Sequence, residues 1–277
     1  MPRFCANLGF LFCEVEFLAR FELAARNGFR AVEFPFPYDY DKDDLAARAR
    51  AAGLQVALFN LHAGDWAYGE RGIACMPARI SEFRDSVART IEYAKALGCT
   101  SVNCLSGIAP PRVPAEKLRE TFLSNVRFAA GELGREGITL MIEPINTRTI
   151  PGFYLRNSGQ ALALMDEAGA ANVKLQYDVF HMQIMEGDLV RTIEAHIDRI
   201  GHIQIADVPD RHEPGTGEIN YPLLFARIDR AGYQGWIGCE YAPVGRTEDG
   251  LGWLRPYCPE PAAAESDVNH RDGGGEQ

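Results

Sequence analysis

The chain has 277 residues, and 47% of them are hydrophobic, which is enough for one large barrel or two ordinary domains. No apolar stretch is long enough to cross a bilayer, and the first residues lack the pattern of a signal peptide. A net charge of -10 argues against nonspecific nucleic-acid binding, which requires a basic surface. We therefore expect a cytoplasmic protein that binds neither nucleic acids nor membranes.

Strand-like runs alternate with helix-like runs along the chain. Strands are expected at residues 3–8, 30–34, 54–60, 100–104, 138–143, 173–178, 200–206 and 235–240. Such alternation indicates a parallel sheet, and eight units match the usual size of a closed (β/α)8 barrel. We predict an α/β fold, a TIM barrel, as a single domain over residues 1–257. A doubly wound open sheet is the alternative, but it would need a glycine-rich phosphate loop after the first strand, where residues 7–12 hold one glycine.

The helices between these strands show amphipathic spacing. In residues 80–97 the predicted inner face consists of Ile80, Phe83, Val87, Ile91, Ala94 and Leu97. Several helices are followed by a glycine that we expect in a left-handed cap, namely Gly28, Gly53, Gly98, Gly137 and Gly232.

Two features of the composition concern the chain as a whole. Residues 258–277 are polar and rich in alanine and glycine without periodicity, and we expect a disordered tail there. The seven cysteines are odd in number and form no CxxC pair. Cys5, Cys104 and Cys239 lie inside apolar runs, so we interpret them as buried free thiols in a reducing compartment.

Four predicted strands carry an oxygen-bearing side chain at or near their end. Glu143, Asp178, Gln204 and Glu240 belong to the runs ITLMIE, VKLQYD, GHIQIAD and GWIGCE. A buried carboxylate is costly unless a cation or strong donors satisfy it. Because the strands of a parallel barrel end at one mouth, these four side chains should converge. Their oxygens favour Mg²⁺ or Mn²⁺, with Co²⁺ or Zn²⁺ as alternatives.

Each of these residues also has an ordinary structural explanation. Glu143 precedes a proline and could cap a loop, and Asp178 could cap the turn after it. Gln204 could be a hydrogen-bonded barrel residue, and Glu240 could pair with Arg246. We favour a shared ion because the four residues fall on successive strands.

Three further side chains are candidates for contact with a substrate. His181 lies just past a ligand strand, in DVFH. Arg211 lies in the loop after the seventh strand, where barrels often bind phosphate, and its guanidinium suits a carboxylate equally well. His62 ends the third strand, and a role in the core explains it as well as a role in binding.

With these residues in hand, the chain resembles the hydroxypyruvate isomerase family, within the xylose-isomerase-like barrel superfamily. The resemblance covers residues 4–257. It is carried by ANLGFLF, by GDW and GERG in the third loop, by EPIN at 143–146, by QYDVFHMQ at 176–183, by HIQIADVPDRHEPGTGEIN at 202–220 and by the final GCEY. Sugar epimerases commonly have histidine where Gln204 stands, which favours the hydroxypyruvate branch.

The resemblance implies a metal-assisted aldose–ketose-type isomerase of glyoxylate metabolism, which interconverts hydroxypyruvate and tartronate semialdehyde. It matches the acid–base pair to Glu143 and Glu240, and the metal ligands to these two with Asp178 and Gln204. Moving the carbonyl requires a proton to leave one carbon and return to its neighbour through an enediolate, which a divalent ion stabilises. The sequence does not tell which glutamate is the base.

Other functions stay open at this point. A 2-oxo-tetronate isomerase or another keto-acid isomerase, a sugar 3-epimerase and an inosose dehydratase all begin with the same proton abstraction. A zinc-dependent DNA-repair nuclease on this barrel would need several histidine ligands and basic surface, and a sugar-acid sensor would not need both glutamates. The expected partner is a small anionic hydroxyketo acid, and a homo-oligomer is compatible with a barrel of this size.

Overall fold

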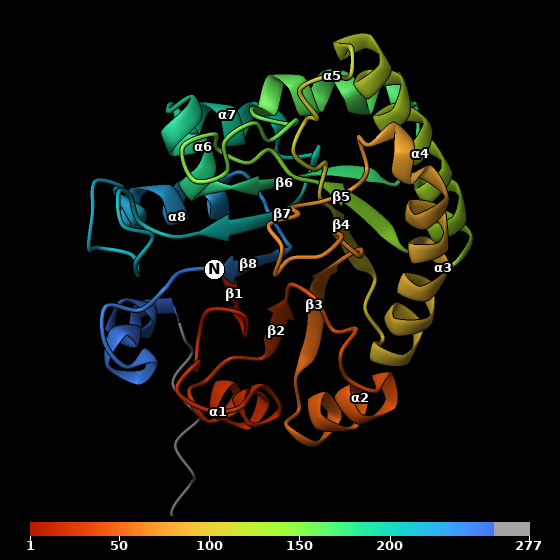
Figure 1. The fold of residues 1–277 in the computed structure, drawn as a ribbon. Helices are drawn as coiled ribbons and strands as arrows, with labels where there is room; N and C mark the ends of the chain where they lie inside the picture. Colours follow the sequence, from red (N-terminus) through yellow and green to blue (C-terminus); the bar gives the residue numbers. More distant parts are fainter. Residues whose placement is uncertain (258–277) are drawn as a thin grey trace, which may run out of the picture.

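The chain folds as a closed eight-stranded parallel barrel in which the strands follow one another in sequence order (Figure 1). The computed structural model describes residues 1–257. The strands are β1 Arg3–Asn7, β2 Ala31–Phe34, β3 Gln55–Asn60, β4 Ser101–Cys104, β5 Thr139–Ile142, β6 Val173–Asp178, β7 Ile200–Ile205 and β8 Trp236–Cys239. The predicted (β/α)8 TIM barrel is therefore confirmed, and β8 closes it by pairing with β1.

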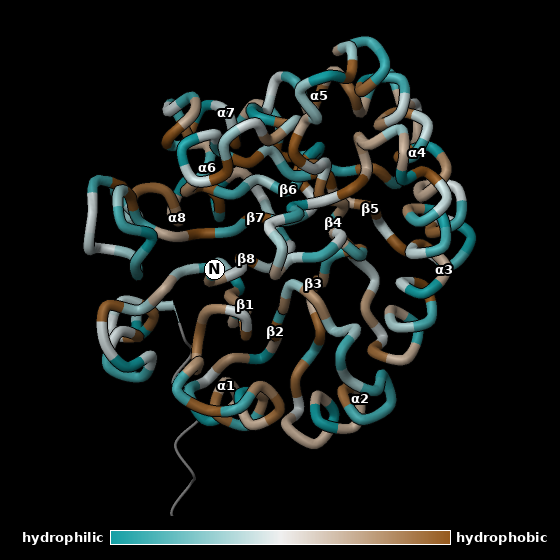
Figure 2. The backbone as a smooth tube through the Cα atoms, viewed as in Figure 1, coloured by the Kyte–Doolittle hydropathy of each residue, from teal (hydrophilic) through white to brown (hydrophobic). Residues whose placement is uncertain are grey.

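Helices surround the barrel and cover the outer face of the strands (Figure 1). They are α1 Arg20–Arg26, α2 Lys42–Ala51, α3 Ile80–Leu97, α4 Ala115–Arg135, α5 Ser158–Ala168, α6 Val179–Met185, α7 Leu189–His196 and α8 Tyr221–Arg230, with short 3-10 segments at Phe17–Ala19, Pro77–Arg79 and Thr247–Tyr257. Figure 2 shows hydrophilic residues along the outer side of α3 and α4, so their apolar faces pack inward on the sheet.

The start and end of several helices follow from local chemistry. All five glycines expected in left-handed caps have positive φ, and Gly98 ends α3 at φ 62°. The buried face of α3 differs from the prediction, because Thr90 and Tyr93 are buried where Ile91 is only partly so. Thr90 Oγ1 lies 2.8 Å from the hydroxyl of Tyr38, and Tyr93 donates to a backbone carbonyl. These hydrogen bonds let polar groups join the apolar face.

The structure bears differently on two expectations, the disordered tail and the absence of a membrane-spanning helix. The predicted disordered tail, residues 258–277, lies outside them, so its structure stays a prediction. Within residues 1–257, none of the helices combines the length and the apolar character that crossing a membrane requires.

Candidate active site

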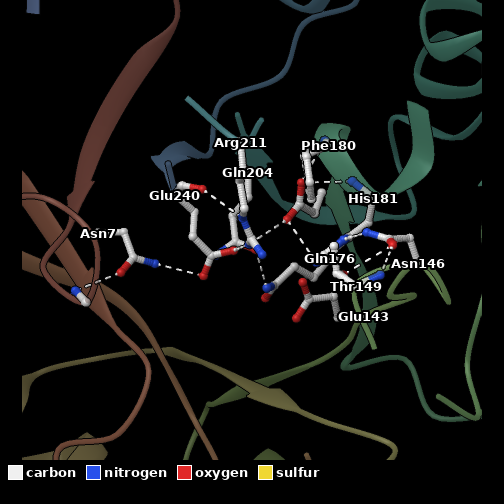
Figure 3. Close-up of polar contacts among 12 residues, drawn as sticks. Asn7, Glu143, Asn146, Thr149, Gln176, Phe180, His181, Gln204, Arg211 and Glu240 are labelled. Carbon is white, nitrogen blue, oxygen red and sulfur yellow. Dashed lines mark hydrogen bonds and ion pairs between the residues drawn. The ribbon is translucent and has the colours of Figure 1, made fainter. Parts of the chain in front are cut away.

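Glu143, Gln204 and Glu240 converge at the mouth of the barrel (Figure 3). Asp178 joins them, because a carboxylate oxygen of Asp178 lies within 4.8 Å of one of Glu143. We call these four side chains the four-residue site. Glu143 and Glu240 each follow the last residue of their strand, β5 and β8, and Asp178 is the last residue of β6. Gln204 lies beside Asp178 in the register of β6 and β7. The sequence prediction that four successive strands deliver these side chains to one place agrees with this geometry.

Asp178 has one oxygen that the protein satisfies and one that it leaves open. Its Oδ1 caps α6 by accepting from the backbone N–H of Phe180 at 2.8 Å. Its Oδ2 is buried and has no hydrogen-bond partner among the described residues. Arg211 Nη2 at 3.6 Å and His181 Nε2 at 3.5 Å face it at ion-pair distance only. A buried carboxylate oxygen in this position calls for another partner.

Both glutamates of the site, Glu143 and Glu240, have a pKa above the ordinary value of a glutamate. Burial, followed by the charges of Glu240 and Asp178, raises the pKa of Glu143 well above its usual value. Burial is also the largest cause that raises the pKa of Glu240 to about 8, and the neighbouring Arg211 opposes it. Crowded carboxylates with raised pKa values are suited to take and return protons near neutral pH.

The residues present fit a divalent cation. The charges of Glu240 and Asp178 raise the pKa of Glu143, and Arg211 reaches these carboxylates from the side of Glu240. The Oδ2 of Asp178 has no hydrogen-bond partner among the described residues, so a divalent cation would offset negative charge that remains in the cluster. An all-oxygen donor set from Glu143, Asp178, Gln204 and Glu240 is typical of sites for Mg²⁺ or Mn²⁺. Such an ion would act as a Lewis acid that stabilises negative charge developing on substrate oxygens.

His181 is oriented as a hydrogen-bond donor toward this site. The Oδ1 of Asn146 accepts the backbone N–H groups of Arg148 and Thr149, so its Nδ2 must face His181 Nδ1 at 2.6 Å. Nδ1 therefore accepts, and the proton of the neutral ring lies on Nε2, on the side of Asp178. Burial lowers the pKa of His181 to about 4. In this tautomer the ring can donate to a substrate oxygen and cannot ligate a metal through Nε2.

Arg211 brings a positive charge directly to the carboxylates. Its Nη2 lies 2.6 Å from Glu240 Oε2, and its guanidinium lies 4.9 Å from the ring centroids of both Phe10 and Phe180. The backbone at Arg211 has φ 60°, a conformation that non-glycine residues rarely adopt. The loop thus holds the side chain at the mouth, where a substrate carboxylate could replace Glu240 as its partner.

His62 lies apart from the four-residue site. Its Nε2 is 3.4 Å from Glu82, and it lines a hollow of about 820 Å³ together with Phe36 and Trp66. This hollow opens over the loops that follow β1 to β3, on the other half of the mouth. Contact of His62 with a small substrate stays a prediction, because no contact joins it to the four residues within the described chain.

Sequence reasoning missed several buried polar residues that support the site. Glu33 on β2 accepts from Asn7 Nδ2 at 2.9 Å and from Gln204 Nε2 at 2.8 Å. The pKa of Glu33 lies below its usual value. Burial alone would raise this pKa, but the charge and hydrogen bond of His202 and the hydrogen bonds of Gln204 and Asn7 outweigh burial. Asn103 on β4 donates to Glu143 at 2.7 Å. The signal was available for Glu33, which interrupts the apolar run AVEF as the four site residues interrupt theirs.

Comparisons with known proteins decide the family. A family model described as xylose isomerase-like TIM barrel matches residues 21–257. The chain belongs to this family. It is 55% identical to a hydroxypyruvate isomerase of Escherichia coli K12, over 93% of this chain and 100% of that protein. It is 50% identical to a 2-oxo-tetronate isomerase of Cupriavidus necator, over 93% of this chain and 99% of that protein.

A solved structure of similar length supports the same placement. The crystal structure titled AP endonuclease, family 2, from Brucella melitensis superposes with a TM-score of 0.92 at 48% identity, covering 94% of this chain and 100% of that one. With isomerases among its close relatives and a barrel of this family, the chain is an isomerase of the hydroxypyruvate isomerase type. The predicted family and enzyme class are confirmed.

Proposed function

We propose that this isomerase interconverts hydroxypyruvate and tartronate semialdehyde with the help of a divalent ion, Mg²⁺ or Mn²⁺. The observation that carries the proposal is the pair Glu143 and Glu240. Both have a raised pKa, and they lie on either side of Arg211 at one mouth (Figure 3). A shift of a carbonyl between adjacent carbons needs a base that takes a proton and an acid that returns it.

The other residues bind and orient the substrate. Arg211 pairs with the substrate carboxylate, because it is the cation that already reaches the site, and His181 donates from Nε2 to a substrate oxygen. Asp178 and Gln204 complete the oxygen ligands of the ion. Phe10 and Phe180 flank the guanidinium of Arg211, whose side chain is 24% exposed, and this partial shielding strengthens its charge interactions.

A four-carbon substrate is the second candidate. It is supported by the 50% identity to a 2-oxo-tetronate isomerase. Hydroxypyruvate remains the first choice because the identity to a hydroxypyruvate isomerase is higher, at 55%.

The endonuclease name of the Brucella relative does not change this choice. A nuclease site of the kind considered would use several histidine ligands, whereas this site offers three carboxylates and one carboxamide. The net charge of -10 also opposes binding to a phosphate backbone. The buried thiols of Cys5 and Cys104 support work in a reducing compartment such as the cytoplasm, where glyoxylate metabolism would supply the substrate.

Turnover of chelator-stripped protein tests the proposal. Hydroxypyruvate, 2-oxo-tetronate and an inosose are offered separately, with Mg²⁺, Mn²⁺, Co²⁺ or Zn²⁺ added back, and the products are followed by NMR. We expect tartronate semialdehyde to form from hydroxypyruvate after Mg²⁺ or Mn²⁺ is restored. Faster turnover of 2-oxo-tetronate would select the four-carbon reaction, and loss of water from an inosose would indicate a dehydratase. Undiminished isomerisation without any metal would refute the ion.

A further inference from the structure

Glu33 is a fully buried glutamate that lies behind the four-residue site. Its Oε1 accepts from Asn7 Nδ2 at 2.9 Å and from Gln204 Nε2 at 2.8 Å. Its Oε2 accepts from His202 Nε2 at 2.6 Å and from the thiol of Cys5 at 3.4 Å. The donors come from strands β1 and β7, so the carboxylate joins strands on both sides of the barrel. An ionised carboxylate can only accept, and here both of its oxygens are satisfied.

The Glu33 carboxylate determines which end of the Gln204 carboxamide faces the four-residue site. A carboxamide has an oxygen that can bind a cation and an NH₂ group that cannot. Because Glu33 accepts the NH₂ group of Gln204, the oxygen of Gln204 is turned to the other side. There it accepts from Gln176 Nε2 at 2.6 Å and keeps a second lone pair. Gln176, which donates to Gln204, has a buried Oε1 that lacks a hydrogen-bond partner among the described residues.

Asn7 is fixed in the same way and links Glu33 to Glu240. Its Oδ1 accepts the backbone N–H of Gly9 at 2.9 Å, so its Nδ2 must point at the carboxylates. Nδ2 lies 2.9 Å from Glu33 Oε1 and 3.0 Å from Glu240 Oε1. One buried carboxylate therefore orients two amides that belong to, or contact, the four-residue site.

The barrel leaves space for this carboxylate at a single glycine. A Cβ atom added at Gly238 on β8 would lie 2.4 Å from Glu33 Oε1 and 2.5 Å from Oε2. Gly238 stands opposite Gln204 in the register of β7 and β8. Any side chain at this position would push Glu33 away from Gln204, so the glycine and the glutamate form one arrangement.

Cys5, Glu33 and His202 could also be considered as a second metal site, because their ligand atoms lie within 4.8 Å of one another. The hydrogen bonds among them argue for a different role, since the three side chains already satisfy one another. We propose that Glu33 is a positioning residue, which turns the oxygen of Gln204 toward the divalent ion. This inference rests on the proposed ion site, and it adds a residue that binds neither ion nor substrate.

Replacing Gln204 by glutamate gives a direct test, because a carboxylate has an oxygen at both ends and needs no orientation. Four proteins are compared for Mn²⁺ affinity by electron paramagnetic resonance: the unchanged chain, Glu33→Met, Gln204→Glu and the double variant. Glu33→Met should weaken Mn²⁺ binding about 10- to 100-fold in the Gln204 background. In the Gln204→Glu background the same change should have no effect or should strengthen binding, because it also removes a like charge. The non-additivity measures the orienting effect.

Two further variants provide an alternative to Glu33→Met and a negative control. Gly238→Ala keeps Glu33 but displaces its carboxylate, and it should reproduce the background-dependent loss if Glu33→Met fails to fold. Cys5→Ser changes another neighbour of Glu33 without touching Gln204, and its affinity for Mn²⁺ should stay within twofold of the unchanged chain.

The outcomes separate the inference from the proposed function. If the unchanged chain binds no Mn²⁺, the ion site and the inference both fail. If it binds Mn²⁺ but the loss is equal in the two backgrounds, or is absent with Gln204 present, only the role of Glu33 is overturned. A second, tightly bound ion lost with Glu33→Met and with Cys5→Ser would show that the cluster is itself a metal site.

Discussion

Glu33 and Glu143 are both buried glutamates in one barrel, and their surroundings are opposite. Glu33 receives donors on both oxygens, and they lower its pKa although burial opposes them. Within residues 1–257, Glu143 receives one side-chain donor, Asn103, and burial together with two other carboxylates raises its pKa well above the usual value. The number of donors around each carboxylate therefore distinguishes the glutamate that we propose as a supporting residue from the one that we propose as an acid–base residue.

The same difference extends to the two halves of the mouth. Strands β5 to β8 deliver the four-residue site, whereas β1, β3 and β4 deliver the amides of Asn7, Asn60 and Asn103. Asn7 donates to Glu240 and Asn103 donates to Glu143, so each glutamate of the proposed acid–base pair accepts from an amide of the other half. Strands β5 to β8 thus carry the carboxylates of the four-residue site, and β1 and β4 carry the amides that orient Glu240 and Glu143.

The largest expected effect is on turnover. Glu143→Gln or Glu240→Gln removes a group that takes or returns the proton, and kcat should fall about 10²- to 10⁴-fold. Stopped-flow or NMR rates with saturating metal measure it. Glu167→Gln, which changes a surface partner of Arg119, serves as the control and should keep kcat unchanged. A loss below threefold in either site variant would remove that glutamate from the acid–base pair.

For the free energy of unfolding, we expect a larger effect from replacing Glu33 than from replacing Glu143. Glu33→Met strips buried donors of their acceptor and should lower the free energy of unfolding by about 3 kcal/mol or more. Glu143→Gln replaces a crowded carboxylate by a neutral group of equal size, so the metal-free protein should be unchanged or more stable. Urea unfolding of both variants at pH 8, without metal, makes the comparison. Equal losses would mean that the two glutamates do not differ as described.

Arg211 connects the two roles, because it pairs with Glu240 and is expected to bind the substrate. Arg211→Lys keeps the charge but loses the planar group between Phe10 and Phe180. We expect kcat/KM to fall about 10- to 100-fold, mainly through KM, as for the loss of a hydrogen bond to a charged group. Arg119→Lys is the matched surface control. An unchanged KM would assign the substrate carboxylate to another partner.

The smallest expected effect concerns pH. Glu240, with a pKa of about 8 in the metal-free protein, is mostly protonated at pH 7 and must release a proton to bind an ion. The affinity for Mn²⁺ should therefore rise with pH, by at most about tenfold per unit below pH 8, and level off above it. Calorimetry in two buffers of different ionisation enthalpy counts the released protons. Binding that releases none would show that Glu240 is ionised before the ion arrives.

The barrel and the four-residue site were predictable from the sequence for a definite reason. Parallel strands buried on both faces read as continuous apolar runs, and a polar residue at the end of such a run stands out. Glu143, Asp178, Gln204 and Glu240 all carry this signal, and closure of the barrel turns four separate runs into one location.

The supporting residues were harder to predict because their role depends on contacts distant in sequence. Glu33 and Gln204 are 171 positions apart, and only the closed barrel brings them to hydrogen-bond distance. His202 is buried like Gln204, and its partner Glu33 on β2 lies 169 positions away in the sequence. The position of His62 against Glu82 depends on how a long loop folds back, which the sequence pattern does not determine.

Anomalous diffraction from a crystal soaked with Mn²⁺ tests the central claim most directly. We predict one strong peak among the side-chain oxygens of Glu143, Asp178, Gln204 and Glu240, with Arg211 remaining outside the ligand shell. An absence of density there, or a peak confined to another cluster such as His62 and Glu82, would contradict a shared ion at the mouth and the chemistry built on it.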